Sequence, residues 1–206
     1  MKYLDPDGRE TIIDQDEHGS FYTDKSTNSF TVGTQRDVEL RKFEKMVFTR
    51  DNPLNQLDLD KALGLETNSR NTVSCQTTAM INAYASSYES GITGKQILMA
   101  LLNKDGSFKN LEHDGSPKSL DGLSRNLAIA MGHDTYLAPS DVKIKVSILA
   151  NLKDGAILGW AKNGKSTDAH FGYTDWQGTI DSMDPNRPAA KNYTKNTYRI
   201  LIEKKL

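Results

Sequence analysis

The sequence contains a single cysteine, Cys75, among its 206 residues. One thiol excludes an internal disulfide and any zinc site that is built from several cysteines. The thiol is therefore either a small buried hydrophobic group or a nucleophile. The residues around it must decide between these two roles.

Long apolar runs and an excess of one charge are also missing. No stretch could span a bilayer, and residues 1–8 lack the apolar core of a signal peptide. Basic and acidic residues number 26 and 27, a formal net charge of -1, which gives no reason to expect nucleic acid or a membrane as a partner. We expect a protein that is cytoplasmic as synthesised and is exported, if at all, within a larger toxin or by a dedicated secretion system.

Motifs for metals and phosphates are missing as well. There is no His-Glu-x-x-His, and the run from Asp5 to Gly8 lacks the spacing of a calcium loop. The run from Gly91 to Lys95 lacks the spacing of a phosphate-binding loop. The sequence therefore predicts no metal and no cofactor.

The composition is that of a soluble globular domain, with 36% hydrophobic and 26% charged residues. Residues 1–34 are predicted to form a polar extension of loops with one or two short strands, and residues 35–206 one domain. Apolar periodicity predicts helices over 35–48, 57–63, 75–88, 95–102 and 119–131, with a less regular one over 140–152. Short β-branched and aromatic runs predict strands over 156–161, 169–174, 179–183 and 198–202. This order favours an α+β fold whose two parts pack as lobes with a cleft between them.

Cys75 lies where a polar loop turns into a predicted helix. A helix N-terminus offers unpaired N–H groups and a partial positive charge, and both favour a thiolate. The backbone N–H of Cys75 could also stabilise an oxyanion. This position favours the nucleophile over the buried structural thiol.

A nucleophilic thiol needs a base, and the chain has four histidines. His18 and His113 lie in polar loops, and His133 follows a helix end, where it would interact with the helix dipole. His170 begins an apolar strand after a loop rich in glycine and lysine, at a place where a cleft could form. His170 is therefore the candidate base.

Asp184 is the candidate third member of a triad. It ends a predicted strand in an Asp-Pro turn, which fixes the direction of its carboxylate. A hairpin that turns near residue 177 would bring Asp184 beside His170, where a carboxylate could hold the imidazole tautomer. Asp168, Asp175 and Asp181 are rival partners, with a poorer register or facing.

The order of these residues resembles the papain-like cysteine peptidase superfamily, and most closely its bacteriocin-leader-processing type. The helix start from Cys75 to Tyr84, the glycine-bearing strand at 155–160, the His170-Phe-Gly-Tyr strand and Asp184-Pro185 carry the resemblance. It implies a papain-like fold, a helical first lobe and an antiparallel sheet in the second part. It also implies a thiol protease that cleaves a protein or peptide substrate with a Cys-His-Asp triad.

Two positions depart from this family. A glutamine usually stands six residues before the nucleophile and donates to the oxyanion, but this chain has Ser69 there. We expect Asn71 to take that role, with Asn68 as the next choice. The glycine that often follows the nucleophile is Gln76 here. Both departures fit an amide hydrolysis on a glutamine side chain as well as they fit peptide-bond cleavage.

The N-terminus carries a second resemblance. The segment from Tyr3 to Arg9 is similar to the one that closes the core of rearrangement-hotspot (YD-repeat) proteins, after which variable toxin domains follow. This implies a polymorphic toxin or effector module with an immunity protein or a carrier protein as a partner. An ordinary Asp-Pro-Asp-Gly turn is the alternative interpretation.

Three hypotheses remain open at the level of sequence. The first is a cysteine hydrolase that acts on protein amide bonds, a peptidase or a glutamine deamidase. The second is an inactive papain-like domain that binds a peptide in its cleft. The third is a structural or interaction domain in which Cys75 is merely buried.

Overall fold

The computed structural model describes residues 2–4, 10–16, 19–24, 29–32, 35–65, 74–141, 155–161, 169–183 and 194–205. In these ranges the chain has a mixed α+β fold with five α-helices and three antiparallel sheets. The helices are α1 (Gln35–Lys45), α2 (Gln56–Leu63), α3 (Cys75–Ser87), α4 (Gly94–Leu101) and α5 (Leu120–Met131).

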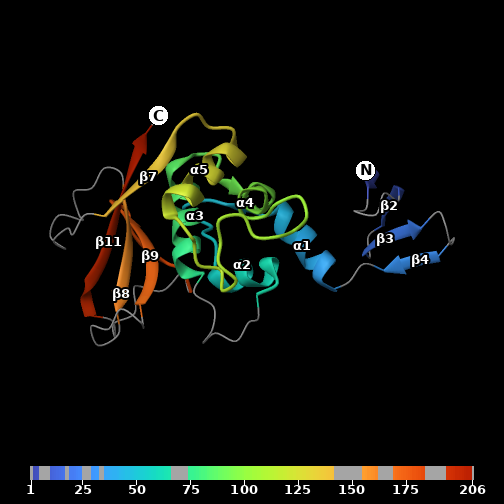
Figure 1. The fold of residues 1–206 in the computed structure, drawn as a ribbon, viewed down its shortest axis with the longest axis horizontal. Helices are drawn as coiled ribbons and strands as arrows, with labels where there is room; N and C mark the ends of the chain where they lie inside the picture. Colours follow the sequence, from blue (N-terminus) through green and yellow to red (C-terminus); the bar gives the residue numbers. More distant parts are fainter. Residues whose placement is uncertain are drawn as a thin grey trace.

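The first sheet is a four-stranded meander that lies beyond α1 (Figure 1). Its strands are β1 (Lys2–Leu4), β2 (Glu10–Asp16), β3 (Gly19–Asp24) and β4 (Ser29–Val32). Each described strand pairs with its neighbour in sequence, so all the strands of this meander come from the predicted N-terminal extension.

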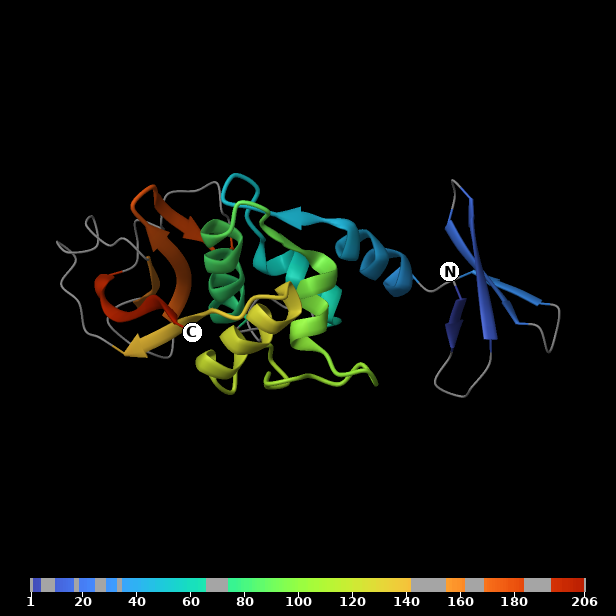
Figure 2. The ribbon, with the colours of Figure 1, turned by 90° about the horizontal axis from the view of Figure 1, so that it is seen from above.

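The main sheet has five strands in the order β10-β9-β8-β11-β7. They are β7 (Tyr136–Asp141), β8 (Ala156–Ala161), β9 (Ala169–Asp175), β10 (Gly178–Asp181) and β11 (Thr194–Lys205), and every neighbouring pair is antiparallel. The helices lie on one side of this sheet, with α3 next to it and packed mainly on β9 (Figures 1 and 2). The start of α3 therefore lies against strands from the other end of the chain.

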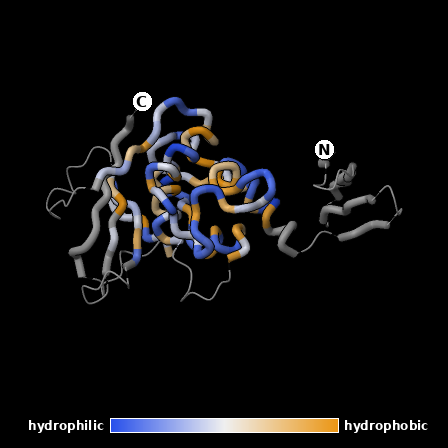
Figure 3. The backbone as a smooth tube through the Cα atoms, viewed as in Figure 1, coloured by the Kyte–Doolittle hydropathy of each residue, from blue (hydrophilic) through white to orange (hydrophobic). Residues whose placement is uncertain are grey.

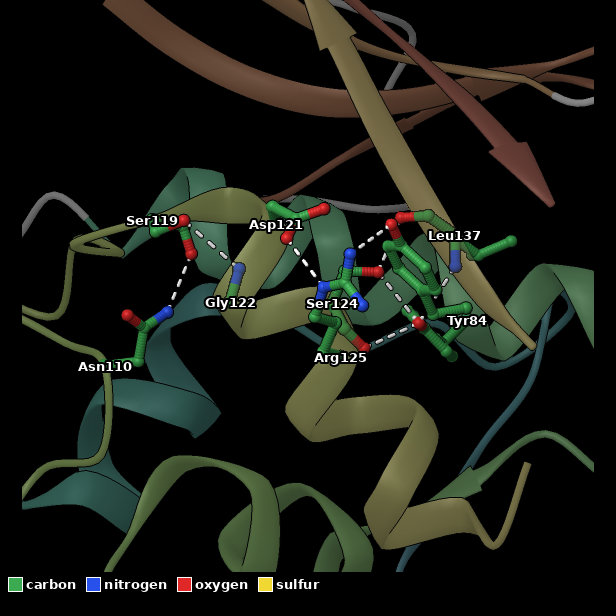
Figure 4. A network of polar contacts seen from close by, with 9 residues as sticks. Tyr84, Asn110, Ser119, Asp121, Gly122, Ser124, Arg125 and Leu137 are labelled. Carbon is green, nitrogen blue, oxygen red and sulfur yellow. Dashed lines mark hydrogen bonds and ion pairs between the residues drawn. The ribbon is translucent and has the colours of Figure 1, made fainter. Parts of the chain in front are cut away.

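The hydrophobic core is centred on α3, where Met80, Ile81 and Tyr84 have no exposed surface. Apolar and polar stretches alternate along the helical part of the chain (Figure 3), as expected for helices that bury one face. The Tyr84 hydroxyl donates to the Ser124 carbonyl at 2.7 Å and accepts from the Leu137 N–H at 3.1 Å (Figure 4). These bonds join α3, α5 and β7.

Several predicted elements are confirmed. The strand over 156–161 has the predicted bounds, and α2 ends at Gly64, which adopts the left-handed conformation as a C-cap. Thr93 caps α4, and Gln96 completes a reciprocal capping box. The helix-then-sheet order of residues 35–206 is therefore the α+β arrangement that the sequence predicted.

Three predictions were wrong in part. The first helix ends at Lys45, because Val47 and Phe48 form strand β5 (Val47–Phe48) against β6 (Ile92–Thr93). The helix expected over 140–152 does not begin at Ser140, since this residue belongs to β7 and pairs with β11; residues 142–152 lie outside the described ranges. The described residues of the N-terminal extension form four strands, where one or two were expected.

No helix in the described part of the chain is long and apolar enough to cross a bilayer.

Candidate active site

Cys75 is the first residue of α3, as predicted, and only 5% of its surface is exposed. The preceding residue, Ser74, makes no side-chain capping bond to the helix. Its hydroxyl donates instead to the carboxylate of Asp60, which is fully buried on α2. The Ser74 side chain thus does not cap α3, and the N–H groups of a first helical turn can stabilise negative charge on a thiolate or an oxyanion.

His170 is the second residue of β9, and it pairs with Trp160 in the neighbouring strand β8. Its side chain is 13% exposed and hydrogen-bonds the side chain of Cys75. The packing of α3 on β9 therefore brings together two of the predicted site residues, which are far apart in the sequence.

The carboxylate that contacts His170 belongs to Asp181, the last residue of β10. Its Oδ1 lies 2.6 Å from His170 Nε2 and also accepts the Met183 N–H at 2.8 Å. Since Nε2 faces Asp181, Nδ1 is the ring nitrogen that is left for the hydrogen bond with Cys75. The side chains of Cys75, His170 and Asp181 form a continuous chain of contacts from thiol to carboxylate.

The charge state of His170 follows from these contacts. Burial lowers the pKa of His170, but the hydrogen bonds to Asp181 and Cys75 and the charges of these two groups outweigh burial and raise the pKa from 6.5 to about 9. The imidazole is therefore an imidazolium at neutral pH, held between the side chains of Cys75 and Asp181.

The sequence favoured Asp184 over Asp181 on hairpin register and facing, but the structure brings Asp181 to His170. The hairpin turns through two residues, 176 and 177, so that Asp181 pairs with Gly172. Residues 170 and 172 share one face of β9, and Asp181 is thus a diagonal neighbour of His170. Counting the register from a two-residue turn would have found it. Asp184 itself lies outside the described residues, and its role stays a prediction.

The predicted oxyanion donor, Asn71, lies outside the described residues, as do Asn68 and Ser69. Among the other histidines, His113 is exposed, and the ring of His133 stacks on Tyr88 at a centroid distance of 4.1 Å. His18 is also outside the described ranges. In the part of the chain that is described, no three His, Cys, Asp or Glu side chains are grouped so as to hold a metal ion.

Comparison with known proteins adds no relative: no family model matches the chain, and searches of curated proteins and of solved structures found no significant match.

Proposed function

We propose that this chain is a papain-like cysteine hydrolase that acts on protein amide bonds, with Cys75 as nucleophile, His170 as acid and base, and Asp181 as the orienting carboxylate. The observation that carries the proposal is the chain of contacts from Cys75 at the start of a helix through His170 to Asp181. The resemblance of the sequence to papain-like peptidases supports the same reading.

The chemistry follows from the protonation state of the pair. The Cys75 thiolate attacks the carbonyl carbon of the amide, and the electron pair of the C=O bond moves onto oxygen. As this intermediate collapses, the C–N bond breaks, and the His170 imidazolium gives its proton to the leaving amine. His170, now neutral, removes a proton from water as the water oxygen attacks the thioester carbon; the C–S bond then breaks, the acid leaves, and the Cys75 thiolate and the His170 imidazolium are restored. Asp181 keeps its bond to Nε2 throughout and holds the ring in place.

The oxyanion needs donors at the start of α3. The backbone N–H of Cys75 is one candidate, because it lies at the N-terminus of α3, where the helix presents its N–H groups. Asn71 remains the proposed second donor. Removing one such donor typically lowers turnover about 100- to 1000-fold.

The competing hypotheses account for less of the site. A thiol that is merely buried requires neither a histidine contact nor a carboxylate behind that histidine. A peptide-binding domain without activity would not need a histidine placed between the thiol and a buried carboxylate. The choice between peptide cleavage and glutamine deamidation depends on the substrate, and we propose the peptidase as the leading form.

The test is incubation of the protein with a library of peptides, followed by mass spectrometry. A peptidase produces new termini, whereas a deamidase converts glutamine to glutamate without cleavage. We expect Cys75→Ala to abolish either product and to leave the unfolding free energy within about 1 kcal/mol, because the variant removes one small side-chain atom. Product formation at the wild-type rate by Cys75→Ala would contradict the mechanism.

We also propose that the hydrolase is a toxin or effector module, on the basis of the N-terminal resemblance to the segment that closes rearrangement-hotspot cores. In that case an immunity protein would block the site around Cys75. Expression of the wild type in the cytosol of a bacterial host should arrest growth, and Cys75→Ala at equal abundance should not. Equal growth of the two strains would argue against a toxin that acts on that host.

A further inference from the structure

Ser182 has no exposed surface, and its hydroxyl donates a hydrogen bond of 2.9 Å to the carbonyl oxygen of Cys75. This oxygen belongs to the first residue of α3. A carbonyl oxygen has two lone pairs, so it can accept from a serine and still take part in the helix. The bond ties the backbone of the proposed nucleophile to the residue that directly follows Asp181.

The segment around Ser182 is a tight turn. Asp181 Oδ1 accepts both His170 Nε2 at 2.6 Å and the Met183 N–H at 2.8 Å. The carboxylate is thus fixed to the backbone two residues further on. Any displacement of Ser182 moves this carboxylate relative to the imidazole.

Helix α2 holds the same turn from a second direction. The Gln56 N–H donates to the Ser182 carbonyl at 2.7 Å, and Asn55 Nδ2 donates to the Met183 carbonyl at 2.8 Å. Asn55 Oδ1 also accepts the Leu57 N–H at 2.8 Å, which caps α2. Bonds from two helices therefore converge on the two residues that follow Asp181.

We propose that Ser182 is a positioning residue, which keeps Asp181 and His170 aligned with the Cys75 thiol by fixing the end of β10 to the start of α3. This inference rests on the proposed function. It assigns to Ser182 no contact with substrate. Its role is to keep the end of β10 at a fixed distance from the start of α3, because a small misplacement of reacting groups greatly lowers the reaction rate.

The side chain at position 182 must donate a hydrogen bond to the Cys75 carbonyl and must fit a place with no exposed surface. Alanine would leave the buried Cys75 carbonyl without its hydroxyl donor. Threonine keeps the donor and adds one methyl group in a place with no exposed surface. Ser182→Thr is therefore the variant expected to restore alignment at some cost in stability.

The experiment measures alkylation of Cys75 by iodoacetamide from about pH 5 to pH 10. Cys75 is the only cysteine, so the mass of the adduct reports this site alone. The wild type should react on the acid side of the range, where an ordinary thiol is inert. At acid pH, Ser182→Ala should be alkylated about tenfold more slowly than the wild type, and Ser182→Thr should recover most of the wild-type rate.

Ser124→Ala is the matched control. Ser124 is also fully buried, and its hydroxyl donates to the Leu137 carbonyl at 2.5 Å, away from Cys75. Both alanine variants should lose stability in urea, but only Ser182→Ala should change the pH profile. A wild-type profile in folded Ser182→Ala would overturn the inference.

A second variant covers the case in which Ser182→Ala does not fold. Asn55→Asp keeps an oxygen for the Leu57 N–H but cannot donate to the Met183 carbonyl, so it loosens the same turn from a less buried position. Like Ser182→Ala, it should lower the rate of Cys75 alkylation at acid pH. An unchanged pH profile of alkylation in this variant would then count against the inference. A wild type that itself shows an ordinary thiol profile would overturn the proposed function, and the assignment of Ser182 with it.

Discussion

His170 and Asp181 are joined at 2.6 Å across the hairpin of β9 and β10, and both side chains are largely buried. A buried carboxylate this close to an imidazole favours the imidazolium. In the proposed mechanism, this pair therefore sets the pH range over which His170 can donate a proton to a leaving group.

We expect Asp181→Asn to lower the pKa of His170 by about 1 to 3 units, because the variant keeps the shape of the side chain and removes its charge. In the wild type, His170 stays protonated until the pH rises through about 9. In the variant it would lose its proton at a lower pH, so the alkaline limit of turnover should move toward acid. NMR titration of the imidazole measures the pKa directly, with His170→Gln to assign the signal. An unchanged pKa would show that Asp181 does not control this proton.

The sequence predicted those parts of the fold that depend on local signals. Thr93 caps α4 and Gly64 ends α2, as expected, because cap residues act on the backbone within a few positions of themselves. The strand Ala156–Ala161 was predicted with its observed bounds, since β-branched and apolar residues between turn residues indicate a strand by themselves.

The parts that were missed depend on partners far away in the chain. Phe48 is extended because it pairs with Ile92, a residue that no local pattern connects to it. The choice of Asp184 over Asp181 depended on one residue of hairpin register, and a shift of one residue moves a side chain to the other face of a sheet. Ser182 gave no sequence signal at all, because its role arises only where β10 ends against α3.

Tyr84 provides a test of stability away from the site. Burial raises the pKa of its hydroxyl to about 12, so this group stays protonated and donates to Ser124. Tyr84→Phe would leave the Leu137 N–H without its acceptor, at a cost of about 1–3 kcal/mol in unfolding free energy. Tyr136→Phe removes a hydroxyl that accepts from the exposed Arg125, so it should cost less than about 0.5 kcal/mol. Urea denaturation measures both, and equal losses would contradict the role of burial.

Arg50 holds the tip of the same hairpin to the helical part. Its Nη2 lies 2.8 Å from Asp175 Oδ1 and its Nε 2.9 Å from Gln177 Oε1, and the Asp175 side chain is only 8% exposed. Arg50→Ala would leave a nearly buried carboxylate without this cation and should cost about 1–3 kcal/mol.

The control for Arg50 is another arginine–carboxylate pair. Arg125 Nε lies 2.7 Å from Asp121 Oδ2, and these side chains are 53% and 48% exposed. Because water screens such a pair, Arg125→Ala should cost at most about 1 kcal/mol. Thermal and urea unfolding compare the two variants, and a smaller loss for Arg50→Ala than for Arg125→Ala would refute the proposed anchoring of the hairpin.

Two successive turns offer a matched pair of glycines. Each turn has an Asp-Gly-Ser sequence in which the aspartate accepts the serine N–H, and the glycines, Gly106 and Gly115, have φ of 79° and 84°. An alanine at either position would be strained by about 1 kcal/mol. The two sites differ in what surrounds them. A Cβ at Gly106 would meet no atom within 4 Å, whereas one at Gly115 would lie 2.9 Å from the Ser74 Cβ.

Gly115→Ala should therefore lose about 1–3 kcal/mol more unfolding free energy than Gly106→Ala, because the overlap with Ser74 adds to the strain that both variants share. Ser74 directly precedes Cys75, so relief of this overlap would displace the start of α3. We accordingly expect Gly115→Ala, measured as folded protein, to slow the alkylation of Cys75 on the acid side, while Gly106→Ala keeps the wild-type rate. Equal stabilities for the two variants would mean that the 112–116 turn moves away from α3 at no cost. An unchanged alkylation rate in a destabilised Gly115→Ala would mean that this turn supports the fold but does not hold Cys75 in place.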